Sequence, residues 1–221
     1  MATWTVHLRI AQRFIDTLPF LESKEFIAGS LAPDCGYKNI GSGFTPPPTV
    51  THFSETGMKN DCNYKAFAKD FLQNSKTYKE YSFYLGYYIH LLTDILWSFN
   101  IYMPTYDIYG ADSKNNPDLV KKIKADWSLL DLKYYCKNSS KPFFNILESI
   151  DEIPDYMPFY EEGQLLRQLK EIAALYQPHK IAQITKSTKY ISDEKVSKFI
   201  QLAYETISID LKTKKFDKPE F

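Results

Sequence analysis

The chain has 221 residues, of which 44% are hydrophobic and 24% are charged, so it is long enough to bury a sizeable core. Lysine plus arginine equals aspartate plus glutamate at 27 each, so no bulk charge favours non-specific binding to nucleic acid or to an anionic membrane. The three cysteines are far apart and form no CxxC pair, which argues against a disulfide framework and a thiolate zinc site.

Apolar residues recur at helical spacing along nearly the whole chain. The first predicted helix is capped by Thr3. The later ones cover residues 21–32, 62–74, 77–102, a segment that opens with Asn116 as cap and Pro117 as first residue, 159–176 and 193–211. Residues 35–51 are rich in Gly, Pro and Thr and predict a long, mobile loop of a kind that is usually functional. We therefore expect one all-α domain over residues 1–221.

The N-terminal sequence MATWTVHLRIAQRFI has no basic region and no long apolar core, which predicts no secretory signal and a cytoplasmic location. Residues 81–106 are long enough to span a membrane. In that case His90 and Asp94 would lie at bilayer depth, and no Lys or Arg brackets the C-terminal end. A helix buried in the core fits this segment better.

Asp94 is the only formally charged residue between Tyr81 and Tyr106, in the stretch GYYIHLLTDILW. A buried carboxylate needs a partner, because desolvating it alone costs several kcal/mol. His90 precedes Asp94 by one helical turn on the same face, and Gly86, another turn earlier, leaves room for a close neighbour. The pair is either a hydrogen bond in the core or part of a metal site.

The positions of the other histidines favour the interpretation of this pair as part of a metal site. His7 falls at the centre of the apolar arc of the first helix, and His52 stands at the exit of the Pro-rich loop. His179, in YQPHK, is expected in a solvated loop, and we assign it no role. Three histidines on apolar faces, together with buried aspartates, are hard to explain as separate core residues.

A second carboxylate also faces inward by its spacing. Asp126 lies within the apolar stripe of Leu119, Ile123, Leu130 and Tyr134. Asp126 is therefore a candidate metal ligand. It would point at the cluster formed by His52 and His90, together with Asn100. The alternatives are a different helix register and a buried salt bridge to a residue such as Arg167.

These residues occur in an order that resembles the zinc-dependent phospholipase C family. The matching pieces are HLRIA (7–11), GSLAPD (29–34), THF (51–53) and GYYIHLLTD (86–94). The resemblance implies an all-α fold, related in architecture to single-strand-specific zinc nucleases, that holds three zinc ions and hydrolyses phosphodiesters.

By this resemblance, Asp34, His52 and His90 would hold one zinc ion. His7 and Asp94 would hold a second ion, which the mature N-terminal residue completes in secreted members. The family's third site needs histidines after the HxxxD aspartate, where this sequence has Asn100 and no histidine between residues 91 and 178. Asp126 and Asn100 are the replacement ligands, and such an oxygen-rich site could prefer a harder divalent ion.

The sequence thus predicts a metal-dependent phosphoester hydrolase with two zinc ions, in which the resemblance makes Asp34 the candidate general base. Its substrate would be a lipid or a small-molecule phosphodiester, and the oligomeric state is left open. The alternatives are a non-catalytic metal-binding or structural module and a hydrolase of nucleotides or other soluble phosphoesters.

Overall fold

Helices form nearly all of the regular structure in the computed structural model, which describes residues 2–41, 43–110, 118–176 and 187–217. The strands within these ranges are β1 (Tyr37–Lys38) and β2 (Phe44–Thr45), which pair antiparallel. The predicted all-α fold is confirmed. Asn116, Pro117 and His179 lie outside the described residues.

The N-terminal helices match the predicted ones closely. Helix α1 (Trp4–Ile15) follows Thr3, although the Thr3 hydroxyl makes no cap and instead donates to Asp131 at 2.5 Å. Helix α2 (Ser23–Leu31) continues into a 3-10 turn, η1 (Ala32–Asp34). This turn contains Pro33 and brings the chain round to Asp34 at its end.

The predicted loop 35–51 is more ordered than its composition indicated. It contains the β1–β2 hairpin, followed by the short helix α3 (Pro48–Thr51). The hydroxyl of Tyr87 donates to the carbonyl of Thr51, which fixes the end of α3 over the central helix. His52 comes directly after this anchored turn.

The centre of the chain is a long helical rod. Helix α4 (Tyr64–Asp70) and the 3-10 turn η2 (Leu72–Asn74) lead into α5 (Tyr78–Trp97). The rod continues without a break through a π-helical turn, η3 (Ser98–Tyr102), into α6 (Met103–Tyr109). The prediction ended this helix at residue 102, but Pro104 is tolerated because it lies in the first turn of α6.

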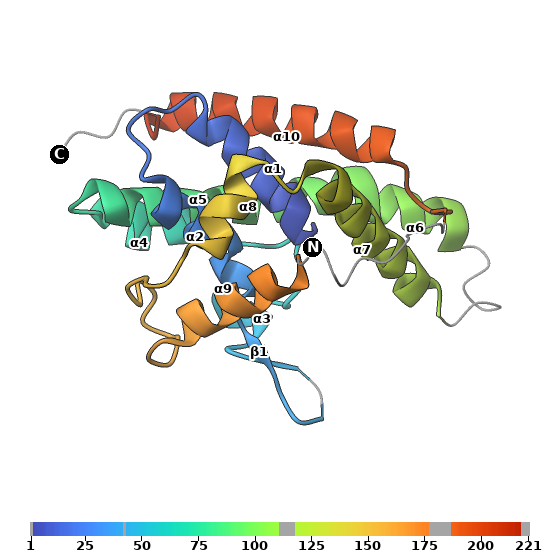
Figure 1. The fold of residues 1–221 in the computed structure, drawn as a ribbon, viewed down its shortest axis with the longest axis horizontal. Coiled ribbons are helices and arrows are strands. Elements are labelled where there is room, and N and C mark those ends of the chain that lie inside the picture. The colour runs from blue at the N-terminus through green and yellow to red at the C-terminus, as the bar shows by residue number, and fades with distance from the viewer. Residues whose placement is uncertain (1, 42, 111–117, 177–186, 218–221) are drawn as a thin grey trace.

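The C-terminal part contains α7 (Leu119–Asn138), α8 (Pro142–Glu148), α9 (Gln164–Leu175) and α10 (Asp193–Lys214). The sequence did not predict α8, and it placed the start of α9 five residues too early. Helix α10 begins where it was predicted, with the hydroxyl of Ser192 accepting from the Lys195 N–H as its cap. In Figure 1, α10 runs along one edge of the molecule beside α1.

The closest helix pair is α2 with α5. A Cβ at Gly29 would lie 2.0 Å from the carbonyl oxygen of Phe83, and one at Gly86 would lie 2.4 Å from that of Phe26. The two backbones therefore touch through reciprocal glycines. Gly86 does leave room for a close neighbour, as expected, and that neighbour is the backbone of α2.

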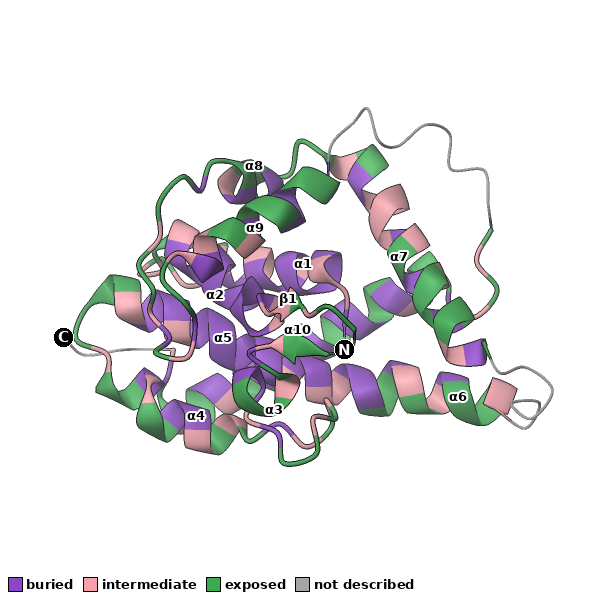
Figure 2. Ribbon diagram, turned by 90° about the horizontal axis from the view of Figure 1, so that it is seen from below, coloured by how far each residue is buried: buried purple, intermediate pink, exposed green. Residues whose placement is uncertain are grey.

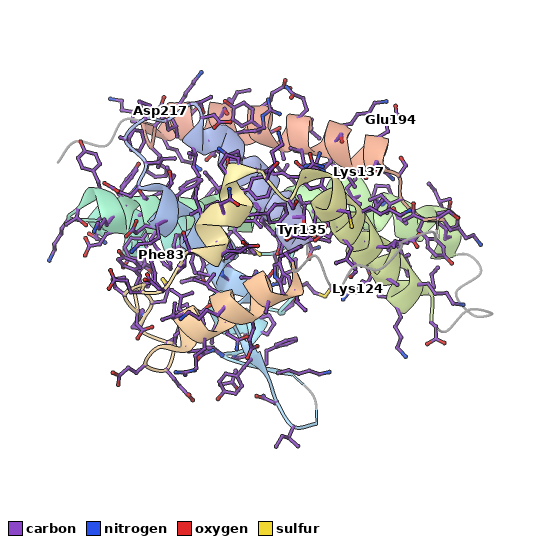
Figure 3. All side chains as sticks on the ribbon, viewed as in Figure 1. Phe83, Lys124, Tyr135, Lys137, Glu194 and Asp217 are labelled. Atoms are coloured by element: carbon purple, nitrogen blue, oxygen red, sulfur yellow. The ribbon has the colours of Figure 1, made fainter. Side chains whose placement is uncertain are left out.

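Figure 2 shows α1, α2 and α5 largely in the colour of buried residues. In Figure 3, Phe83 lies among the helices, whereas Lys137 and Glu194 belong to outward-facing surfaces of α7 and α10. Within the described ranges, no helix combines the length and the apolar character that crossing a membrane requires. Residues 81–98 are largely buried inside the helical bundle, as expected, whereas Phe99, Asn100, Met103 and Tyr106 are exposed.

Candidate metal centre

Five of the seven predicted ligands meet at the centre of the bundle. His7 comes from α1, Asp34 from the turn after α2, His52 from the end of α3, and His90 and Asp94 from α5. Each side chain is at most 3% exposed. Segments far apart in the sequence thus bring imidazoles and carboxylates into one buried cluster, which we call the metal centre.

Four donor atoms lie close together at the centre: Asp34 Oδ1, His52 Nε2, His90 Nε2 and Asp94 Oδ2. His52 Nε2 lies 3.4 Å from Asp34 Oδ1 and 3.5 Å from Asp94 Oδ2. His90 Nε2 lies 3.6 Å from Asp94 Oδ2 and 4.0 Å from Asp34 Oδ1. Ligand atoms around a tetrahedral zinc ion are about 3.3 Å apart. The donor atoms of Asp34, His52 and His90 all lie within 4.8 Å of one another, a spacing that could hold one metal ion.

The tautomers of the two histidines leave lone pairs on the same side. His90 Nδ1–H donates to the carbonyl of Ser30 at 2.8 Å, so its Nε2 carries the lone pair. His52 Nδ1 lies 2.9 Å from the hydroxyl of Thr51, while its Nε2 accepts from Lys59. The two Nε2 atoms are 3.3 Å apart. Facing lone pairs at this distance are stabilised by a cation between or beside them.

His7, His90 and Asp94 form a second group that could hold a metal ion. His7 Nε2 lies 3.5 Å from Asp94 Oδ1, the carboxylate oxygen that also accepts from the backbone N–H of Ala2 at 2.6 Å. The other oxygen of Asp94 faces His52 and His90. One carboxylate therefore serves both groups, with one oxygen directed at each.

Burial keeps two of the imidazoles neutral. Burial, with a smaller effect of His90, lowers the pKa of His7 to about 4. Burial together with the ammonium of Lys59 lowers the pKa of His52 to about 4. Neutral imidazole is the form that binds a metal ion.

The carboxylates are held in the charged form. Burial alone would raise the pKa of Asp34, but the hydrogen bond from His52 and the charge of Lys59 hold it well below its ordinary value. Burial would also raise the pKa of Asp94, which the amino-terminal charge and His7 nevertheless hold well below the usual range. The centre thus combines the ionised carboxylates of Asp34 and Asp94 with the neutral imidazoles of His7 and His52.

A further observation indicates that the residues of the centre fit a divalent metal ion. Several buried atoms of the centre have no hydrogen-bond partner within the described part of the chain: His7 Nδ1 and Nε2, Asp34 Oδ2 and Asp94 Oδ2. Unpaired buried polar atoms are rare in folded proteins, because each costs free energy. A metal ion and its water ligands would satisfy them.

Lys59 is a residue of the centre that sequence reasoning missed. Its ammonium donates to His52 Nε2 and lies 3.7 Å from Asp34 Oδ1 and 3.8 Å from Asp94 Oδ2. The side chain is only 13% exposed. In the sequence it stands in GMKND, where a single lysine in a polar turn carries no signal of a buried position.

A cavity of about 150 Å³ opens onto the centre. Asp34, His52 and Lys59 line its inner end, and the walls are mainly apolar, including Trp4 and Phe44. The predicted loop 35–51 contributes to these walls through Phe44 and other residues. The cavity therefore gives access to the centre from this side, and a function of the loop stays a prediction.

Asn100 does not lie at the centre, and this prediction is wrong. Its side chain is exposed and donates to the carbonyl of Leu96 at 2.8 Å. Six residues correspond to a rotation of about 120° from Asp94 on an α-helix. The π-helical turn from Ser98 onward changes the register of the rod further.

Asp126 is also placed elsewhere. Its carboxylate accepts from the backbone N–H groups of Lys189 and Tyr190, at 2.6 and 2.7 Å. Among the described residues, it belongs to no group of possible metal ligands. The alternative partner Arg167 donates instead to the carbonyl of Glu162. The expectation that Asp126 points at His52 and His90 is therefore wrong.

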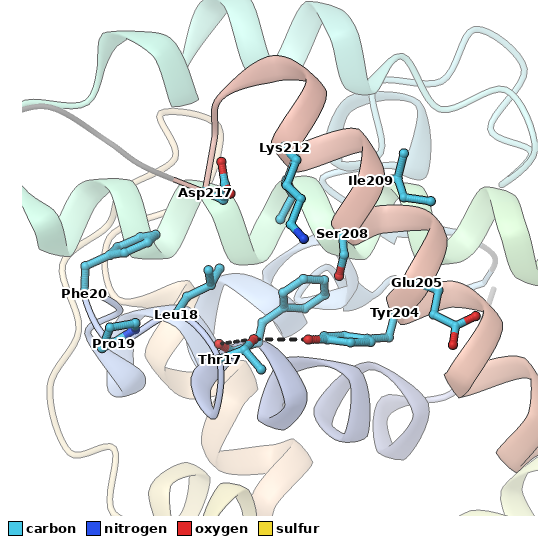
Figure 4. Close-up of a pocket in the computed structure, with 12 residues that line it drawn as sticks. Thr17, Leu18, Pro19, Phe20, Tyr204, Glu205, Ser208, Ile209, Lys212 and Asp217 are labelled. Carbon is cyan, nitrogen blue, oxygen red and sulfur yellow. Dashed lines mark hydrogen bonds between the residues drawn. The ribbon is translucent and has the colours of Figure 1, made fainter.

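A larger cavity in the described part of the chain lies away from the metal centre. It measures about 810 Å³ and lies between the segment after α1 and helix α10 (Figure 4). Leu18, Phe20 and Ile209 contribute apolar surface, and the hydroxyl of Tyr204 donates to that of Thr17. None of its lining residues belongs to the metal centre, so size alone does not identify the site.

Comparison with protein families places the centre within a matched segment. A family model described as zinc dependent phospholipase C matches residues 6–97, a segment that contains His7, Asp34, His52, His90 and Asp94. Neither the curated proteins nor the solved structures contain a significant match to this chain. The segment matched by the family model ends at the last residue of α5, three residues after Asp94.

Proposed function

Because the match over residues 6–97 supports membership of the zinc-dependent phospholipase C family, we propose that the chain is a metal-dependent phosphoester hydrolase. The observation that carries the proposal is the buried group of Asp34, His52 and His90, whose donor atoms all lie within 4.8 Å of one another, with Asp94 beside it. Bound divalent metals lower the pKa of water towards 7 and neutralise phosphate oxygens.

Two ions of unequal affinity suit the centre. The first would be held by four donors, from Asp34, His52, His90 and one oxygen of Asp94. The second would be held by His7 and the other oxygen of Asp94, which leaves more of its positions to water. We propose zinc for both sites, because imidazole and carboxylate are its usual oxygen and nitrogen ligands.

Asp34 is the proposed catalytic residue. Its Oδ1 faces His52, while its Oδ2 is buried and unpaired within the described chain. The lowered pKa of Asp34 keeps the carboxylate ionised, so Oδ2 can accept a hydrogen bond from an attacking water and orient it. This role uses Oδ2, whereas the oxygen that would bind the metal ion is Oδ1.

The cavity indicates the class of substrate. Its inner end carries the charges of Asp34 and Lys59, and its walls include the apolar surfaces of Trp4 and Phe44. A phosphodiester with one apolar substituent fits this distribution, because the phosphate would face the centre and the substituent the walls. Phospholipids and aromatic phosphodiesters both have this chemistry.

Metal content and hydrolysis test the proposal together. Protein purified without chelator should contain one to two equivalents of zinc by elemental analysis, and it should hydrolyse bis(p-nitrophenyl) phosphate. Asp34→Asn should lower turnover at least tenfold, whereas Asp70→Asn, at an exposed aspartate at the end of α4, should not. Protein without metal after reconstitution would refute the metal-dependent hydrolase. Full activity of Asp34→Asn would refute the catalytic role of Asp34.

A second candidate is a metal-binding module without catalysis. It is favoured because Asn100 and Asp126 provide no third group of ligands in the described structure. The two candidates differ in one result. Stoichiometric metal with no hydrolysis of soluble diesters or of phospholipid vesicles would favour the non-catalytic module.

A further inference from the structure

Lys59 contacts the same donor atoms that would hold the first metal ion. Its ammonium donates to His52 Nε2 and lies 3.7 Å from Asp34 Oδ1 and 3.8 Å from Asp94 Oδ2. These three atoms are among the four donor atoms that lie close together at the centre. Lysine itself offers no lone pair while it is charged, so it joins the centre as a cation and not as a ligand.

The loop that carries Lys59 is built to hold it there. The carboxylate of Asp61 accepts from the hydroxyl of Ser54 and from both the N–H and the hydroxyl of Thr56. Residues 54 and 62 form an isolated bridge, and Cys62 Sγ donates to the carbonyl of Lys59 at 3.4 Å. The loop is thus closed on itself across its base. The position of Lys59 follows from this internal bonding and not only from its long side chain.

A metal ion and this ammonium exclude one another. Two cations that share the same carboxylates within a few ångströms repel strongly in a buried site, because water does not screen them. The ammonium has somewhere to go, since Lys59 also lines the cavity of about 150 Å³. It is the one lysine or arginine among the described residues that line this cavity, and the anionic phosphate of a substrate would enter there.

We propose that Lys59 is an internal cation that competes with the metal for Asp34, His52 and Asp94, and that metal binding moves its ammonium into the cavity to bind the phosphate of the substrate. The second half rests on the proposed function. With the metal absent, Lys59 neutralises the buried carboxylates. With the metal bound, it becomes a positioning residue for the phosphodiester. Lys59 thereby links metal loading to the formation of the anion site.

Zinc affinity tests the competition directly. We compare the wild type with Lys59→Met, Lys59→Arg and the matched control Lys65→Met, whose lysine is exposed and outside the centre. Lys59→Met should bind zinc about tenfold more tightly in a competition titration with a chromophoric chelator. Lys59→Arg and Lys65→Met should stay close to the wild type. A folded Lys59→Met that binds zinc no more tightly than the wild type would overturn the competition.

Loss of the counter-charge could unfold Lys59→Met before zinc is added. A second measurement therefore uses the wild type alone. An amine-reactive reagent should modify Lys59 several times faster after zinc is added, with Lys65 as internal reference in the same mass spectrum. Equal modification of Lys59 with and without zinc would show that the ammonium is not displaced.

Phosphate binding tests the second position. Inorganic phosphate should bind the zinc-loaded wild type at least fivefold more tightly than zinc-loaded Lys59→Met, as measured by calorimetry. Equal affinities would overturn the anion-binding role. None of these measurements needs turnover, so a wild type that binds zinc and phosphate through Lys59 but hydrolyses nothing would refute the hydrolase alone. Hydrolysis with unaltered zinc and phosphate affinities in the variant would refute the role of Lys59 alone.

Discussion

The imidazoles of His7 and His90 stack face to face, with ring centroids 3.8 Å apart and an angle of 3° between the planes. Two positively charged rings could not stack in this way in a buried site. The rings share Asp94, whose Oδ1 lies 3.5 Å from His7 Nε2 and whose Oδ2 lies 3.6 Å from His90 Nε2. The stack therefore directs one nitrogen of each ring at a different oxygen of the Asp94 carboxylate.

Replacing His90 should reduce both stability and metal content. His90→Ala removes a ligand and leaves Asp94 with less compensation for its buried charge, a loss of about 3–5 kcal/mol. We expect a clear drop in melting temperature and loss of the tighter zinc ion by elemental analysis. A chelator should lower the melting temperature of the wild type but change that of His90→Ala much less.

Asn100→Ala is the matched control for this variant. Asn100 was a candidate ligand by sequence, but its exposed side chain makes one hydrogen bond to its own helix. The substitution should change the free energy of unfolding by less than about 0.5 kcal/mol and leave the zinc content as it is. Loss of metal in Asn100→Ala would contradict the placement of this residue.

Stability should fall as the pH decreases from about 6.5 to 4. His7 and His52 have pKa values of about 4 in the folded chain, against about 6.5 when unfolded. Between these values the unfolded chain binds more protons, so stability rises with pH through this window and is complete above it. For each of these histidines, the free energy of unfolding falls by roughly 2–3 kcal/mol as the pH decreases through this window. Urea unfolding at several pH values in the presence of a chelator measures the effect.

The variant His7→Gln removes the contribution of one histidine to this pH dependence of stability. It should flatten the pH profile between 4 and 6.5 relative to the wild type. Asp34 and Asp94 have lowered pKa values, so their contribution is present at higher pH and is lost only below about 4, the pKa of an unfolded aspartate. An unchanged slope in His7→Gln would mean that this ring is protonated in the folded chain.

Helical spacing predicted much of the candidate centre. His90 and Asp94 lie one turn apart on α5, and burial of that helix forces both side chains into the interior. His7 follows from the apolar face of α1 in the same way. Such inferences depend only on local periodicity, which a single sequence contains. That the five residues bind metal stays a prediction.

The misplaced residues depend on non-local contacts. The buried side of α7 includes Trp127 and Tyr135, so the predicted stripe was rotated and Asp126 lies at its edge. Its partners, the N–H groups of Lys189 and Tyr190, are more than sixty residues away along the chain. Lys59 was missed for the same reason, since its place is set by the bonding of its loop to Asp61.

Asp126→Asn should destabilise the chain without affecting metal. The carboxylate accepts two backbone N–H bonds, and hydrogen bonds to a charged group contribute about 1.5–3 kcal/mol each. Asparagine keeps one acceptor oxygen, so we expect a loss of about 1–2 kcal/mol in urea unfolding. Zinc content and turnover should equal those of the wild type. A lower metal-to-protein ratio would restore Asp126 as a ligand.

The two proposed ions should be separable by mutation. His52→Ala should abolish the tighter zinc ion, because it removes one of four donors from that group. His7→Ala should remove the weaker ion and leave about one equivalent bound. Isothermal titration of both variants gives stoichiometry and affinity. Equal loss of both ions in each variant would mean that the ions bind as one coupled unit through Asp94.

Gly86→Ala tests how the packing of α2 on α5 supports the centre. A Cβ at Gly86 would lie 2.4 Å from the carbonyl oxygen of Phe26 and 2.9 Å from the Ser30 nitrogen, both of which are backbone atoms. Neither can move without shifting α2, and overpacking of this kind costs about 1–3 kcal/mol or more. The same shift displaces the Ser30 carbonyl that orients His90 through Nδ1, so zinc affinity should also fall.

Gly110→Ala provides the matched control for this last variant. A Cβ there would meet only the side chain of Tyr106, at 3.0 Å, and the backbone φ of −75° suits alanine. A side chain can turn aside where a backbone cannot, so Gly110→Ala should change the melting temperature by no more than a few degrees. Zinc titration of both variants then separates a general loss of stability from a misaligned His90. If Gly86→Ala lost stability but kept wild-type zinc affinity, the Ser30 carbonyl would not be what orients His90.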